Sequence, residues 1–114
     1  MKNLLIIIVF LFSITAQSQI IITSSSATSG TITGNTTQQD QIVAHDAGAT
    51  VTMTIAFPNP PRDNQSFTIG SVGGITTLTL TAVTGTIANL ITTLATGGSV
   101  TYRYSLSMNK WIKI

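Results

Sequence analysis

The chain has 114 residues and only eight charged ones, five Lys or Arg and three Asp, with no Glu. Charged residues make up 7% of the chain, against roughly 25% in typical soluble domains, and 21 Thr and 11 Ser supply hydroxyl groups instead. The absence of Cys and Glu, together with a single His, excludes disulfide scaffolds, cysteine-based zinc sites, thiol nucleophiles and paired-glutamate chemistry. The length allows one domain, and the scattered basic residues lack the clustered stripe that nucleic-acid binding requires.

Residues 1–18 have the pattern of a signal-peptide-like leader or membrane anchor. Lys2 precedes an apolar run over residues 4–12, and small residues follow as far as Ser18. This pattern predicts an N-terminal hydrophobic helix, either a secretory signal cleaved before Gln19 or a retained anchor that brings residues 1–22 into contact with a membrane. A membrane span needs about 20 predominantly apolar residues, whereas Gln17, Ser18 and Gln19 interrupt this stretch, so we favour the cleaved signal.

Residues 19–41 form a Ser/Thr-rich segment with few apolar residues after Ile22. Such a composition buries too little apolar surface to offset its ordering entropy. We therefore expect a stalk or linker, or else a strand that orders only against another chain.

Residues 42–114 show the alternation of a half-buried β domain. Apolar residues alternate with Thr from Val51 to Phe57, and Pro-rich or Gly-rich segments separate that run from later ones. The pattern predicts that Tyr102, Tyr104 and Leu106 share the inward face, while Trp111 shares a face with Lys113. Expected strands lie at 50–57, 66–70, 76–82, 99–107 and 110–114, with a short strand and loop at 86–94 and a further strand at 41–44.

Short strands about ten residues apart favour an all-β fold, specifically a small antiparallel β-sandwich or jelly-roll-like domain. Monomeric sheet proteins usually protect their edges with Lys, Glu or Pro, and this chain has few such residues. We therefore expect it to bury its edges against copies of itself, as a homo-oligomer and most simply a homotrimer.

The order of several motifs resembles the C-terminal β modules of bacteriophage fibre and spike proteins. The motifs are the Pro-rich turn at 58–61, the D-x-Q step at Asp63 and Gln65, the G-x-T-T-L-T-L strand at 74–80, the Gly-Gly turn with an aromatic strand at 97–104, and N-x-W at 109–111. The resemblance implies a trimeric knob on a slender stalk that binds a host receptor, often a surface glycan. A membrane-containing virion whose spike is anchored by the N-terminal helix would reconcile this resemblance with the leader.

Few residues suggest a site. His45 and Asp46 are adjacent, but neighbouring strand residues point to opposite faces and no G-x-S-x-G motif occurs, so we interpret them as a turn pair and expect no catalytic site. Three dispersed Asp residues do not make a calcium loop, and we expect no metal or cofactor. We interpret Tyr102 and Tyr104 as core or interface residues rather than a sugar-stacking platform, and Trp111 as less deeply buried.

The longest polar loop of the head is the best candidate for binding, because binding residues concentrate on loops held by a rigid scaffold. The predicted contacts are Arg62, Asp63, Asn64 and Gln65, together with Arg103, which alternates with Tyr102 and Tyr104 and so points away from their face. We expect a non-enzymatic structural virion spike or fibre protein at the virion surface, whose head binds a host-cell glycan or other receptor. The alternative is an exported bacterial cell-surface or adhesin-like module.

Overall fold

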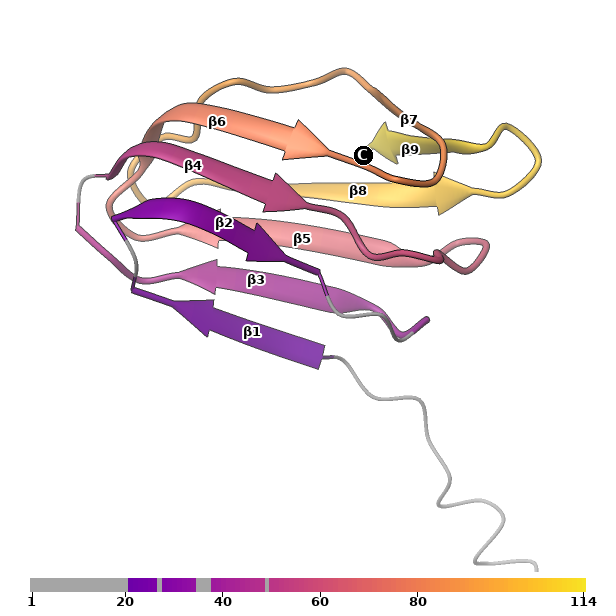
Figure 1. The fold of residues 1–114 in the computed structure, drawn as a ribbon, viewed down its shortest axis with the longest axis horizontal. Helices are drawn as coiled ribbons and strands as arrows, with labels where there is room; N and C mark the ends of the chain where they lie inside the picture. The colour runs from indigo at the N-terminus through magenta and orange to yellow at the C-terminus, as the bar shows by residue number, and fades with distance from the viewer. Residues whose placement is uncertain (1–20, 27, 35–37, 49) are drawn as a thin grey trace, which may run out of the picture.

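The computed structural model describes residues 21–26, 28–34, 38–48 and 50–114, and its described part is a β-solenoid (Figure 1). Its strands are β1 (Ile21–Ser25), β2 (Ser29–Thr33), β3 (Gln41–His45), β4 (Thr50–Ala56), β5 (Ser66–Ser71), β6 (Ile75–Thr81), β7 (Thr86–Ala88), β8 (Ser99–Ser105) and β9 (Lys110–Lys113). The described residues contain no helix, and the expected N-terminal helix lies outside them.

The first six strands form three stacked coils, and each coil contributes one strand to each of two sheets. In the six-stranded sheet, in the order β1-β3-β5-β8-β9-β7, the first three strands are parallel. The three-stranded sheet, in the order β2-β4-β6, is parallel throughout. Two parallel neighbours in one sheet need a crossover connection, and the strand between them in sequence, which lies in the other sheet, is part of that connection.

Alternation along each strand directs one set of side chains between the sheets, and the stacking aligns these sets into rows. Ile32, Ile55 and Leu80 occupy one row of the three-stranded sheet, and all three are buried. Val43, Ile69 and Val100 form a corresponding buried row in the six-stranded sheet. Repetition of the coil thus builds a continuous core from residues that are distant in sequence.

An aromatic cluster fills the core at the C-terminal end of the stack. Phe57, which follows β4, lies 4.8 Å from the ring of Phe67, 5.2 Å from Tyr102 and 5.0 Å from Trp111, measured between ring centroids. The Tyr104 ring lies 5.3 Å from Trp111. These rings come from the second and third coils and from the β8–β9 hairpin, so the cluster fastens the hairpin to the solenoid.

The two ends of the stack differ. Beyond the third coil, β8 pairs antiparallel with β5, and residues 92–94 hydrogen-bond to the free edge of β6 through Leu78 and Ile75. At the N-terminal end, β1 and β2 are the outermost strands of their sheets among the residues that the structure describes. Among the described residues, the six-stranded sheet therefore ends at the C-terminal side in the three-residue β7, whereas the first coil presents two strand edges of five residues each.

The structure confirms the all-β class and corrects the predicted architecture. The expected antiparallel sandwich or jelly roll is wrong, because successive strands of a coil enter different sheets and each then pairs in parallel with the strand of the next coil. The segment expected to be a stalk contains β1 and β2, which pair with β3 and β4 of the same chain. Backbone pairing orders this hydroxyl-rich segment, with Ile32 as its buried anchor.

Two side-chain orientations also differ from expectation. We expected Trp111 to be less deeply buried because it shares a face with Lys113. It is fully buried, because it lies opposite Tyr104 and packs against Phe57. Leu106 is 62% exposed, since β8 ends at Ser105 and the chain turns there. The inward alternation therefore stops at Tyr104.

Candidate functional site

The polar loop proposed for binding ties the third coil to the start of the second. The Arg62 guanidinium donates through Nε to the Gln38 carbonyl at 2.7 Å and forms a 3.3 Å ion pair with Asp40, with both side chains nearly half exposed. Gln65 is completely buried, where its Nε2 donates to the Gln39 carbonyl at 2.7 Å and its Oε1 accepts the Arg62 backbone N–H at 2.9 Å. Gln65 therefore serves the interior rather than a ligand.

The other predicted contacts lie at the same end of the six-stranded sheet. Asp63 accepts the backbone N–H of Leu106 at 2.9 Å, and Asn64 adopts a left-handed φ of 63° while its N–H donates to the Tyr104 carbonyl. Arg103 is exposed and pairs in register with Ser66, directly after the loop. The structure thus brings Arg103 beside the loop, with Gln65 as the one predicted residue turned away from solvent.

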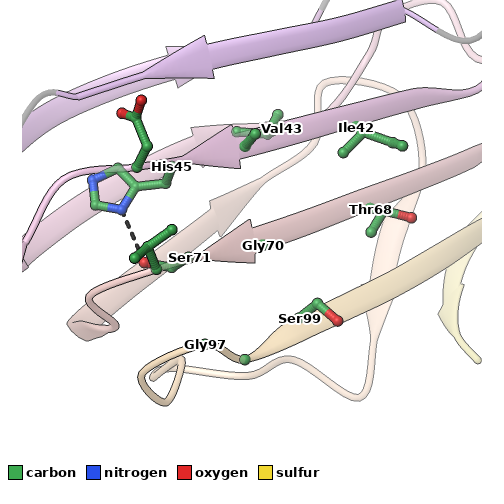
Figure 2. Close-up of a pocket in the computed structure, with 12 residues that line it drawn as sticks. Ile42, Val43, His45, Thr68, Gly70, Ser71, Gly97 and Ser99 are labelled. Atoms are coloured by element: carbon green, nitrogen blue, oxygen red, sulfur yellow. Dashed lines mark hydrogen bonds between the residues drawn. The ribbon is translucent and has the colours of Figure 1, made fainter.

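His45 and Ser71 form a buried pair at the opposite end of that sheet (Figure 2). His45 Nδ1 lies 2.9 Å from Ser71 Oγ, and Ser71 Oγ also accepts the Gly74 backbone N–H at 3.0 Å. Both residues are at least 95% buried, whereas Asp46, the sequence neighbour of His45, is exposed. The pair joins the ends of β3 and β5, so His45 is a buried strand residue and not the surface or turn residue that we expected.

A hollow of about 350 Å³ lies on the outer face of the sheet, next to this pair. In register across β3, β5 and β8, Ala44, Gly70 and Ser99 form its floor, and Ile42 and Thr68 lie in the adjacent row. A Cβ at Gly70 would approach no atom outside its neighbours closer than 3.9 Å, so small side chains create the hollow. Figure 2 shows Thr68 and Ser99 on adjacent strands along it.

The exposed lining of the hollow is almost entirely apolar, so the hollow suits the apolar part of a ligand. Its rim offers the Ser99 hydroxyl and the single carboxylate of Asp46, whereas the Thr68 hydroxyl is hydrogen-bonded to the Thr101 hydroxyl at 2.9 Å. Sequence reasoning missed this site, although one signal was present: Gly70 interrupts an otherwise regular strand, and a strand glycine often marks a close approach or a missing side chain. The small residues that complete the floor come together only through the parallel register.

The aromatic residues considered for sugar stacking belong to the core. Tyr102, Tyr104 and Trp111 are each at most 2% exposed, and the Tyr102 hydroxyl donates to the Asn89 carbonyl at 3.0 Å. Burial raises the pKa of the Tyr102 phenol above its ordinary value of 10.0, and a backbone hydrogen bond from Ile91 partly opposes that shift. None of these rings can stack on a ligand at the surface.

Two further features are absent from the described ranges, a cluster of metal-binding side chains and a membrane-spanning helix. There, no three His, Cys, Asp or Glu side chains gather at a point that could hold a metal ion. The same ranges contain no helix of the length and apolarity that crossing a bilayer requires. The predicted membrane contact of residues 1–22 lies almost entirely outside them.

Comparison of the chain with protein-family models, with curated proteins and with solved structures finds no match.

Proposed function

We propose that this chain is a structural virion spike or fibre protein, a homotrimer whose β-solenoid head displays a surface for a host receptor. The observation that carries the proposal is the difference between the two ends of the stack. The chain enters at the end with open strand edges, and the aromatic cluster and hairpin cover the far end. This polarity suits a head that is attached at its N-terminal side and exposed at its tip.

The open edges support self-association. The β1 and β2 strands contain no Lys, Glu or Pro, the residues that usually block edge pairing, and Ile22 on β1 is 64% exposed. Pairing with neighbouring copies would satisfy the backbone groups of both edges and cover this apolar side chain. The first coil is therefore the part of the head that we assign to the contact between subunits.

The receptor surface that we propose is the outer face of the six-stranded sheet. It carries the apolar hollow with the Asp46 carboxylate at one end, and the exposed loop residues and Arg103 at the other. An apolar recess flanked by one hydroxyl group and one carboxylate, with an arginine further along the sheet, suits a host-surface glycan that presents an apolar ring face beside its hydroxyl groups. The export-type leader favours an alternative, an adhesin-like module on a bacterial surface, which would use the same face.

Light scattering of the exported protein tests the association. We expect an oligomer at micromolar concentration that Ile22→Lys weakens, because a charge on β1 opposes edge pairing. Val83→Lys is the matched control, since Val83 is 83% exposed and lies outside the strands. A wild-type monomer, or equal effects of the two variants, would rule out this edge as the subunit contact.

Adsorption to host cells tests the receptor face. We expect Gly70→Phe, which fills the hollow, and Arg103→Ala to reduce binding of the purified head, while Leu90→Ala leaves binding unchanged. Leu90 is 58% exposed and lies outside this sheet. Adsorption that survives both Gly70→Phe and Arg103→Ala would place the receptor contact elsewhere. Mass spectrometry of particles would distinguish a virion component from a cell-surface protein.

A further inference from the structure

The outer face of the three-stranded sheet carries an ordered array of hydroxyl groups. Alternate residues of β2, β4 and β6 point outward, and the parallel register aligns these side chains in three rows across the strands. The threonine face, as we name it, consists of the rows Ser29-Thr52-Thr77, Thr31-Thr54-Thr79 and Thr33-Ala56-Thr81. Thr54 and Ala56 in the central strand are half-buried, and the other side chains are exposed.

The register fixes the spacing of this array in two directions. Neighbouring parallel strands lie about 4.8 Å apart, and alternate residues of one strand repeat about every 6.6 Å. The pairing of β2 with β4 runs from Ser29 to Thr33, and the pairing of β4 with β6 runs from Thr52 opposite Thr77 to Ala56 opposite Thr81, with no residue skipped. The side chains therefore form a grid that repeats in two directions, and all of them carry both a hydroxyl and a methyl group except Ser29, which lacks the methyl group, and Ala56, which lacks the hydroxyl group.

The chemistry of the face is as uniform as its spacing. It contains no charged and no aromatic side chain, and within the described part of the chain no hydrogen bond engages its hydroxyl groups. Because threonine is branched at Cβ, its side chain has few rotamers and the grid is held in place before any ligand arrives. Each threonine then presents one methyl group and one hydroxyl group to the same surface.

We propose that the threonine face binds ice. Water oxygens on the prism plane of ice repeat at distances close to both spacings of the grid, so the hydroxyls can occupy lattice positions while the methyl groups rest between them. A soluble glycan is a poorer fit, because the threonine face offers no aromatic side chain on which a sugar ring could stack. An uncharged, two-dimensionally periodic surface is suited to a partner that is itself a lattice.

This activity is independent of receptor binding, since it uses the opposite sheet. It requires only the stacked coils and holds for a virion spike and for an exported cell-surface module alike. Failure of the ice proposal would leave the receptor face untouched, and the two proposals can be tested separately.

The test is incorporation of the fluorescently labelled exported protein into a slowly growing ice hemisphere, together with inhibition of ice recrystallisation. Thr54→Tyr places a bulky ring at the centre of the grid, and we expect incorporation to fall about tenfold. Thr79→Tyr, on β6, is a second variant with the same expected loss. The matched control is Thr86→Tyr, which alters an exposed strand threonine of the other sheet and should incorporate like the wild type.

Three outcomes would overturn the proposal. The first is a folded wild-type protein that incorporates no better than Thr54→Tyr, and the second is an equal loss for Thr86→Tyr. The third is a change in oligomeric state caused by Thr54→Tyr or Thr79→Tyr, which would show that another copy of the chain covers the face. Circular dichroism of each variant establishes that it folds, and Thr79→Tyr replaces Thr54→Tyr if the latter does not.

Discussion

Gln65 illustrates how a polar side chain can hold two coils together. Its amide group satisfies a carbonyl of the second coil and a backbone N–H of its own loop, and it does so without any exposed surface. Arg62 bridges to the same segment from outside, where water competes with its ion pair. The two residues are neighbours with very different energetic roles.

We expect Gln65→Ala to lower the free energy of unfolding by about 2 kcal/mol, because it leaves two backbone groups without their buried partner. Arg62→Ala should cost about 1 kcal/mol or less, as is usual for an exposed ion pair. Urea denaturation measures both values. An equal or larger cost for Arg62→Ala would show that the outer bridge, not the buried amide, secures the loop.

Tyr102 gives the protein a stability limit in alkali. Its folded pKa is raised chiefly by burial, so above pH 10 the unfolded chain loses this proton more readily than the folded one. Stability from this group is complete below pH 10 and then falls by up to about 1.4 kcal/mol per pH unit until the folded pKa is reached. We expect Tyr102→Phe to flatten that decline in denaturation curves recorded from pH 8 to 11, and an unchanged slope would exclude Tyr102 as its source.

At the scale of elements, the turns that connect the two sheets stack on one another through backbone hydrogen bonds, as the strands do. Val72 donates its N–H to the His45 carbonyl at 3.0 Å, and Gly97 donates to the Val72 carbonyl at 3.0 Å. A Cβ at Gly73 would collide with the backbone of Gly48 and Ala47 in the turn of the second coil. Gly73 therefore sets how closely these turns approach.

Gly73→Ala should destabilise the fold by about 2–3 kcal/mol, because backbone atoms have to move to admit the methyl group. Gly48→Ala is the matched control from the facing turn, since a Cβ there meets no atom within 4 Å. Thermal unfolding followed by circular dichroism compares the two variants. Equal melting temperatures would mean that the stacked turns can separate without cost.

Period-two alternation identified β4, β5, β6 and β8 from the sequence, because it reports which side of a strand is buried. It carries no information on whether the neighbouring strand is parallel, so it could not exclude a sandwich. The recurring T-x-T at 31–33, 52–54 and 77–79 was the available sign of stacked coils. Unequal offsets concealed it: Ile21 pairs with Gln41, 20 residues later, whereas Gln41 pairs with Phe67, 26 residues later.

The sequence predicted only part of the candidate site, again because alternation and composition carry no information on which strands are neighbours. Loop composition correctly located Arg62 at the surface, and strand alternation did so for Arg103, but neither can tell that Gln65 turns inward to meet Gln39. The hollow depends on Ala44, Gly70 and Ser99 standing side by side, which only the register provides.

At the scale of the whole molecule, the core is distributed unevenly along the stack. Ile32 is the one member of the core cluster contributed by described residues 21–34, whereas the aromatic rings lie in the later coils and the hairpin. The first coil therefore depends on its neighbours more than they depend on it. This imbalance agrees with a first coil that gains stability from contact with another subunit.

We expect a chain that begins at residue 38 to remain folded with reduced stability, because it keeps the aromatic cluster. A chain that ends at residue 98 should not fold, since it loses Tyr102, Tyr104 and Trp111 and uncovers Phe67. Near-ultraviolet circular dichroism and proteolysis separate the two cases. Loss of structure in the first truncation, or its retention in the second, would contradict this distribution of stability.

The in-register stacking of coils also makes the length of this protein adjustable. A duplicated coil inserted ahead of β3 would meet the same backbone pairing above and below, and it would leave the terminal hairpin undisturbed. Gene duplication could therefore lengthen the rod one coil at a time and widen its threonine grid by one strand with each step.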